Sequence, residues 1–261
     1  MKMLITLAAC AAIMMSGCQT NVGNDKNTEF SMSGISDKKV KKELEVEYFT
    51  ELYITGAPDI IFNQTSGGKP RVCIEGSKSY VERVYAQNRG KALIIGLKDS
   101  RGINIRNNGD AKIYLYAPDL TELNITGSGD FKATHGIDTD NLKINVTGSG
   151  DMELASLICD DTDIRITGSG DMDVKNATCN NADIRVTGSG DVKFDKLTAR
   201  QSAKIVTTGS GDVDIRFENS GDVVCRATGC SDITLKGNVK SMDKKCSGTG
   251  DVHTRGLRVG K

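Results

Sequence analysis

Residues 142–155 read LKINVTGSGDMELA, in which two runs of alternating apolar and polar residues flank the five-residue sequence Thr-Gly-Ser-Gly-Asp. On each side of this sequence, every second side chain is apolar and the side chains between are mostly polar or charged. A period of two with β-branched residues is typical of half-buried strands. The two glycines allow the chain to bend without a Cβ clash. We therefore expect two strands joined by a corner, and we call each copy of the five residues a TGSGD corner.

The TGSGD corner recurs along the second half of the chain. Copies begin at positions 126, 147, 167, 187 and 208, and two diverged copies begin at 228 and 247, so the spacing between successive copies is nearly constant. A fixed period near twenty indicates a solenoid. Twenty residues at about 3.3 Å each describe a circuit of roughly 66 Å, and circuits stacked about 4.8 Å apart pair each strand with its equivalent. This predicts an all-β fold, a parallel β-helix with about 20 residues per coil.

The beginning of the chain differs from the repeats. It reads MKMLITLAACAAIMMSGC, an apolar run that ends in small residues before Cys18, which is typical of an export signal. We expect a lipoprotein signal peptide over 1–17, with lipidation at Cys18; the alternative is an ordinary signal peptide with an incidental cysteine. Residues 18–42 are predicted to be a flexible tether.

Residues 43–120 are predicted to be an opening β region and residues 121–261 the repeated coils, together one continuous domain. The stretch ITGAPDI at 54–60 looks like a degenerate corner, and residues 77–90 read as a short helix or an irregular excursion. The opening region would also shield the unpaired edge of the first coil.

Several of these features together resemble a known family. They are the signal with its lipidation cysteine, YITGAPDIIFNQ at 53–64, IYLYAPDLTELNITGSGD at 113–130 and the serial corners. The chain resembles the auto-transporter adhesin, head GIN domain family of Bacteroidetes-type bacteria over roughly residues 43–255. The resemblance implies a right-handed parallel β-helix exported to the cell envelope, with a role in adhesion.

The aspartates that close the corners are the first candidate site. Stacking would align them on one edge, where carboxylates could bind calcium; the candidates are Asp130, Asp151, Asp171, Asp191 and Asp212, followed by Asp232 and Asp251. Calcium takes about six to eight oxygen ligands, and each coil supplies one such carboxylate. The alternatives are solvated turn residues or catalysis. No cofactor other than this calcium is expected.

The cysteines suggest disulfides, because an exported protein meets a compartment in which disulfides persist. Cys159 and Cys179 lie at the same place in consecutive coils, so their Cα atoms should be about 4.8 Å apart, within the range of a disulfide. Stacked free thiols in the core are the alternative. Cys225 and Cys246, separated by about one coil of sequence, form a second candidate pair.

Catalysis is not expected. His135 and His253, the only histidines, fall about six coils apart, and neither has a serine or cysteine in a nucleophile motif. The outward residues that follow the corners carry mixed charges, as at Lys132, Glu153 and Asp173, which favours solubility and cross-strand pairing.

Composition limits the partners. Lys and Arg together number 34, as do Asp and Glu, so the formal net charge is zero and gives no reason to expect nucleic acid or an anionic membrane surface. We expect a cell-envelope lipoprotein that its lipid holds to a membrane, and we favour the outer membrane over the inner membrane. Its head would be a non-catalytic surface that binds glycans, envelope proteins or host proteins. The alternatives are a β-helical polysaccharide-active enzyme and a module that self-associates through the edge of its last coil, near VHTRGLRVGK.

Overall fold

The structure is a computed structural model that describes residues 38–98 and 111–260. The predicted signal peptide, Cys18 and most of the predicted tether lie outside the described residues. The strand β1 (Lys39–Glu45) already includes residues 39–42, so the last part of the predicted tether is strand. None of the helices in the described part is long and apolar enough to cross a membrane.

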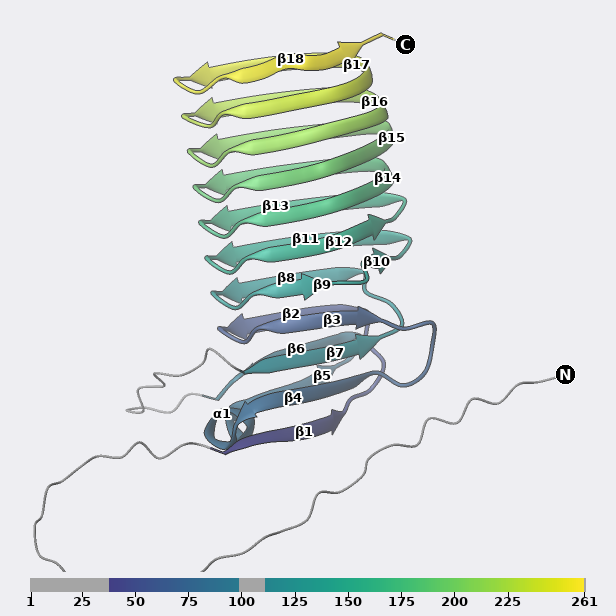
Figure 1. Ribbon diagram of the computed structural model, residues 1–261, viewed down its shortest axis with the longest axis vertical. Coiled ribbons are helices and arrows are strands. Elements are labelled where there is room, and N and C mark those ends of the chain that lie inside the picture. The colour runs from purple at the N-terminus through teal and green to yellow at the C-terminus, as the bar shows by residue number, and fades with distance from the viewer. Residues whose placement is uncertain (1–37, 99–110, 261) are drawn as a thin grey trace, which may run out of the picture. The chain divides into compact units, whose positions relative to one another are not determined.

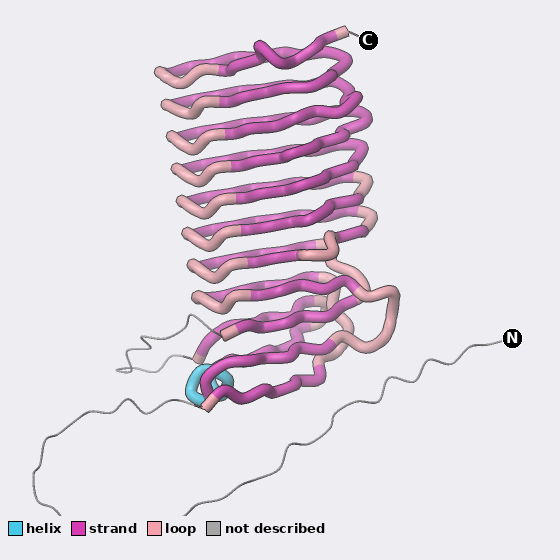
Figure 2. The backbone as a smooth tube through the Cα atoms, viewed as in Figure 1, coloured by secondary structure: helices cyan, strands magenta, loops and turns pink. Residues whose placement is uncertain are grey.

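The repeated coils form a stack of parallel strands, as Figures 1 and 2 show. Its strands are β8 (Glu122–Gly127), β9 (Phe131–Ala133), β10 (Ile137–Asp138), β11 (Asn141–Gly148), β12 (Met152–Ile158), β13 (Asp161–Gly168), β14 (Met172–Gly188), β15 (Val192–Gly209), β16 (Val213–Gly229), β17 (Ile233–Gly248) and β18 (Val252–Val259). Equivalent residues of successive coils lie opposite one another, for example Ile164 and Ile184. The predicted all-β solenoid, with one coil for each period of the TGSGD corner, is confirmed.

The core consists of columns of apolar side chains that run through the coils. In β13, Ile164 and Ile166 are buried while the residues on either side of them point outward. Ile164 lies opposite Ile144 in one neighbouring coil and Ile184 in the other. Burial of each such side chain stabilises the fold by about 1.5–3 kcal/mol. Because a slip of one residue would turn the whole apolar set outward, these columns fix the register between coils.

The opening region enters the stack out of chain order. The coil of β2 (Glu51–Gly56) and β3 (Ile60–Gln64) lies between the coil of β6 (Ala92–Leu97) and β7 (Lys112–Ala117) and the coil of β8 and β9. Gly56 therefore lies opposite Gly127, which comes much later in the chain. The degenerate corner at 54–60 is thus a true corner of the stack. The coil of β6 and β7, which follows it along the chain, lies on one side of it, and the later coil of β8 and β9 lies on the other side.

An antiparallel layer covers the N-terminal end of the stack. The strand β4 (Arg71–Ser77) pairs with β7 on one side and with β1 on the other, and β5 (Val84–Arg89) pairs with β6. Between β4 and β5 lies the helix α1 (Lys78–Arg83), whose N-cap Ser77 accepts a hydrogen bond from the amide of Tyr80. Residues 77–90 therefore contain a short helix followed by a strand. The edge β1 is rich in charge, a feature that opposes pairing with other chains.

Candidate functional site

The two glycines of the TGSGD corner, the second of which is replaced by Ser231 in the copy at 228, share one constraint and differ in another. The first has a positive φ, from 116° at Gly229 to 137° at Gly127, a conformation that L side chains rarely adopt. The second does not lie in this region. A Cβ atom on Gly170 would lie 2.2 Å from the carbonyl oxygen of Gly150 in the preceding coil. A Cβ on Gly168 would lie equally close to the preceding coil, 2.1 Å from the carbonyl oxygen of Gly148. The prediction that both glycines avoid a Cβ clash is therefore confirmed, and positive φ is found at the first glycine alone.

The aspartates form a hydrogen-bonded column that we call the aspartate ladder. The amide of Asp151 donates to Oδ1 of Asp130 over 3.0 Å, and the amide of Phe131 donates in return to the carbonyl of Asp151 over 2.9 Å. The amide-to-carboxylate bond, at 2.7–3.1 Å, joins every pair of neighbours in the series Asp59, Asp130, Asp151, Asp171, Asp191, Asp212, Asp232 and Asp251. Each carboxylate before Asp251 thus fastens the next coil at its corner.

Asp59 begins the ladder and was missed from the sequence. Its carboxylate oxygen Oδ1 accepts a hydrogen bond from the backbone amide of Asp130 at 3.1 Å. Ala57 and Pro58 replace the usual serine and glycine of the corner, so the copy was recognised only as degenerate and its aspartate was not counted with the others. The position of ITGAPDI, already read as a degenerate corner, was the signal that could have found it.

The ladder gives the calcium candidates Asp130, Asp151, Asp171, Asp191 and Asp212 a structural role. One oxygen of each accepts a backbone amide from the next coil. Within residues 38–98 and 111–260, no group of three or more His, Cys, Asp or Glu side chains is placed to hold a metal ion. Calcium binding at this edge stays a prediction.

Beside the aspartate ladder run two columns of exposed hydroxyls, which we call the hydroxyl edge. It consists of Thr126, Thr147, Thr167, Thr187, Thr208 and Thr228 at the strand ends, and of Ser128, Ser149, Ser169, Ser189 and Ser210 in the corners. Thr167 lies directly opposite Thr147 and Thr187, so the hydroxyl groups repeat about every 4.8 Å. The corners that carry them are aligned as a column of loops along one edge of the stack in Figure 2.

The face that follows the corner carries paired charges. Lys132 pairs across strands with Glu153, and Lys175 pairs with Asp195 of the next coil at 3.4 Å and with Asp173 of its own strand at 3.0 Å. The hydrogen bond from Lys193 holds the pKa of Asp195 below its usual value. This face thus shows the cross-strand pairing that its mixed charges predicted.

A shallow hollow of about 490 Å³ lies on the strands that precede the corner. Its charged lining includes Lys143, Asp163, Asp183 and Lys204. An enzyme of this fold would use such a convergence of acidic and basic groups. Here Asp163 pairs with Arg165 at 2.7 Å and with Arg185 at 3.6 Å. The two histidines lie elsewhere, His135 in the turn before β10 and His253 in β18.

The structure brings the first pair of candidate cysteines together and offsets the second pair. Cys159 and Cys179 are buried and joined by a thiol hydrogen bond, which together with burial raises the pKa of Cys159. Cys225 lies opposite Lys244, and Cys246 opposite Ala227, so this pair is offset by two residues. Burial raises the pKa of Cys225 to about 11, whereas Cys246 is exposed. All six described cysteines are free thiols, and a disulfide between Cys159 and Cys179 stays a prediction.

Comparison with known proteins gives the same architecture. A family model described as "Putative auto-transporter adhesin, head GIN domain" matches residues 48–224 and 199–261. A comparison with curated proteins found no match.

Three solved structures are similar to the chain, each over 84% of its length. They are a "putative adhesin" from Bacteroides fragilis (22% identity, TM-score 0.74, 97% of that chain covered), a "putative lipid binding protein" from Parabacteroides distasonis (20%, 0.67, 97%) and a "putative adhesin" from Parabacteroides merdae (19%, 0.64, 96%). At these identities the likeness shows the fold. Because the family model spans the opening region and the repeated coils alike, the chain belongs to the auto-transporter adhesin, head GIN domain family.

Proposed function

We propose that the chain is an exported cell-envelope lipoprotein whose solenoid is a non-catalytic binding head, with the hydroxyl edge as its contact surface. The observation that carries the proposal is the alignment of exposed threonine and serine hydroxyls in consecutive coils, fixed by the aspartate ladder beside them. The adhesin family to which the chain belongs supports a surface that binds.

The hydroxyl edge suits a partner that also repeats. Each hydroxyl donates one hydrogen bond and accepts others. Single contacts of this kind are weak in water, since a net hydrogen bond contributes about 0.5–1.5 kcal/mol. When many such groups on a rigid frame contact one partner at the same time, little conformational freedom is lost. The weak contacts are then linked, and their combined affinity exceeds that of any single contact. A polysaccharide presents hydroxyl groups at regular intervals, and we take it as the partner of this edge.

The charged groups support binding without turnover. Two carboxylates in the hollow before the corner, Asp163 and Asp183, are held in ion pairs with arginine, and a third, Asp161, accepts a hydrogen bond from Asn181. Those on the face after the corner are held by lysine, as at Asp173 and Lys175. The ion-paired carboxylates are occupied by cations of the chain itself, whereas a catalytic acid or base must reach the proton that it transfers.

Anchoring completes the proposal. Lipidation at Cys18 would place the head at a membrane, with residues 19–38 as the spacer, and we assign the outer membrane. Growth with labelled palmitate tests this: the native chain should incorporate the label and the Cys18→Ser variant should not. Incorporation by the variant would contradict anchoring at this cysteine.

Binding itself is tested with the mature chain carrying Cys18→Ser, mixed with purified envelope polysaccharide or mucin glycans and sedimented. We expect the protein to sediment with at least one polymer, and we expect the polymer's reducing ends and chain length to stay unchanged over hours. Shortening of the polymer would establish an enzyme instead. Failure to bind any polysaccharide, with retention by envelope or host protein, would refute the choice of partner.

A further inference from the structure

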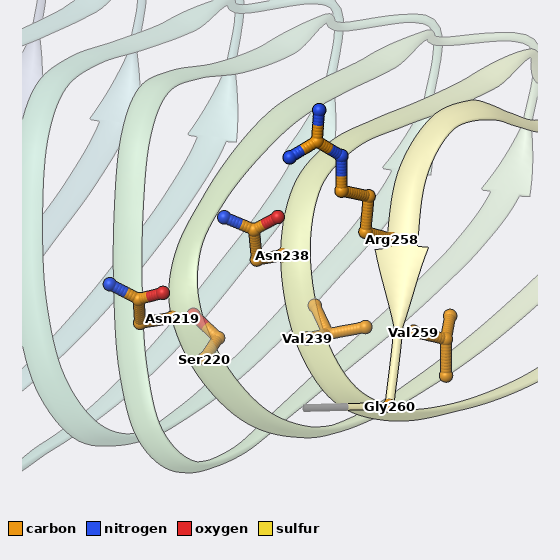
Figure 3. Close-up of a pocket in the computed structure, with 7 residues that line it drawn as sticks. All are labelled: Asn219, Ser220, Asn238, Val239, Arg258, Val259 and Gly260. Carbon is orange, nitrogen blue, oxygen red and sulfur yellow. The ribbon is translucent and has the colours of Figure 1, made fainter.

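The far turn of the last coils, on the opposite side from the TGSGD corners, contains a hollow that the proposed function does not use. It has a volume of about 410 Å³ and is lined by Asn219, Ser220, Asn238, Val239, Arg258, Val259 and Gly260. This is within the range of small-molecule sites, about 300–1,000 Å³. Figure 3 shows the side chains of Asn219, Asn238 and Arg258 standing side by side on successive coils and pointing to the same side.

A bulge creates this hollow. The register between β16 and β17 shifts between Phe217 and Ser220, where Phe217 lies opposite Gly237 and Ser220 opposite Val239. Asn219 has a φ of 47°, the only positive value at a described residue other than glycine. Ser220 is turned inward, where its hydroxyl donates to the carbonyl of Leu197 and accepts the amide of Ala199. Bulges re-aim side chains, and this one directs Asn219 outward beside Asn238.

Ser220 is satisfied within the fold, but the three exposed polar side chains of the hollow have no partner in the described part of the chain. Among the described residues, none forms a hydrogen bond or ion pair with the side chain of Asn219, Asn238 or Arg258. Two cations of the last coils are paired, Lys236 with Asp214 at 3.1 Å and Arg226 with Asp243, whereas Arg255 of the same strand, like Arg258, has no ion pair among the described residues. Arg258 thus offers a complete set of guanidinium donors to a ligand.

The chemistry of the lining selects a class of ligand. A guanidinium presents a planar fork of donors that matches a carboxylate with two parallel hydrogen bonds. The carboxamides of Asn219 and Asn238 both donate and accept, as hydroxyl-bearing ligands require. Val259 is 55% exposed and Val239 is buried next to it, so an apolar surface lies beside the polar groups. A sugar ring offers both an apolar C–H face and hydroxyls.

We propose that this hollow binds a carboxylate-bearing sugar, a uronic acid unit, with Arg258 bound to the carboxylate and the two asparagines bound to ring hydroxyls. The site is open to solvent, so the affinity for a single unit is weak, on the order of millimolar. A polymer with several such units could contact the hollow and the hydroxyl edge through separate segments.

The test is an NMR titration of the mature chain carrying Cys18→Ser. The probes are methyl α-galacturonide, the uncharged methyl α-galactoside and galactose 6-phosphate. We expect saturable shifts of the side-chain signals of Arg258, Asn219 and Asn238 with the galacturonide, at least tenfold weaker binding of the galactoside, and weaker binding of the phosphate. No saturable shift would overturn the proposal. Equal binding of the galactoside would do so too, and tighter binding of the phosphate would make this a phosphate site.

Variants distinguish recognition by the planar guanidinium of Arg258 from attraction by any positive charge. Arg258→Gln should weaken galacturonide binding at least tenfold, and Arg258→Lys, which keeps the charge without the fork, at least threefold. Arg255→Gln removes an exposed cation of the same strand outside the hollow and should leave binding unchanged. Equal losses in Arg258→Gln and Arg255→Gln would show non-specific attraction and refute the site. Because the probes are single sugars in solution, the result does not depend on binding by the hydroxyl edge.

Discussion

Asp171 donates its amide to the carboxylate of Asp151 over 3.0 Å, and its own carbonyl accepts the amide of Met152 over 2.8 Å. The two residues thus hold consecutive coils together in both directions at the corner. The same exchange runs along the stack, which explains why the aspartate is the last residue of each repeated corner.

The ladder can be tested at Asp171. Its carboxylate accepts the amide of Asp191 at 2.8 Å, so Asp171→Ala should lower the free energy of unfolding by about 1 kcal/mol, which is below the roughly 1.5–3 kcal/mol of a hydrogen bond to a charged group because the site is exposed. Asp171→Asn keeps an acceptor oxygen and should lose less. Urea denaturation followed by circular dichroism measures both.

Asp173→Ala is the matched control for this prediction. Asp173 forms only a surface ion pair with Lys175, and its removal should change the free energy of unfolding by less than about 0.5 kcal/mol. Equal effects of the two alanine variants would contradict a structural role for the ladder.

The second glycine of the corner gives a prediction based on stacking. Gly170→Ala places a Cβ 2.2 Å from the backbone of the preceding coil, so the coils must separate locally, and we expect destabilisation of more than about 2 kcal/mol. Gly90→Ala is the control for backbone strain alone: its φ is 60° and no atom lies within 4 Å of the added Cβ. It should cost about 1 kcal/mol. If thermal unfolding shows Gly170→Ala to be the milder change, the stacking explanation is wrong.

The contact between Cys159 and Cys179 predicts a disulfide under oxidising conditions. Both thiols are buried and hydrogen-bonded to each other. After treatment with oxidised glutathione, peptide mass spectrometry should find the bridge between these two residues. Cys225 and Cys246, offset by two residues, should not be joined. A bridge between Cys225 and Cys246 in the folded chain would contradict the register of the last coils.

The stack ends in an edge that the last strand covers only in part. Of β17, only Ile233–Val239 pairs with β18, and among the described residues no strand covers its second half. Lys244 lies there opposite the core residue Cys225, and its Nζ donates to the carbonyl of Val252 at 2.9 Å. A lysine at an open edge opposes pairing with another chain.

Lys244→Val should therefore produce concentration-dependent dimers in sedimentation velocity, while the native chain stays monomeric. Lys245→Val makes the same change at the adjacent position, which points away from the core, and should leave the chain monomeric. Dimers of the native chain would instead favour the self-associating module.

The repeated coils could be predicted from the sequence because the signals agree: a nearly constant period, alternation around each corner, and glycines where the chain bends. The order of the opening coils could not. β2 pairs with both β6 and β8, and alternation says which face is buried but not which strand is the neighbour. The hollow at Arg258 was also missed, since an asparagine tolerates positive φ but does not by itself locate a bulge, and the residues of the lining come from three coils.

The proposed role of the hydroxyl edge is tested most directly by binding of a double variant, Thr167→Val with Thr187→Val, to the polysaccharide that retains the native chain. Valine keeps the β-branched shape and removes the hydroxyls. The control is Thr178→Val with Thr198→Val, a pair that also lies opposite each other in neighbouring coils but away from the corner. We predict at least a tenfold loss of affinity for the edge variant and none for the control. Unchanged binding by the edge variant, or an equal loss in both, would contradict the hydroxyl edge as the contact surface.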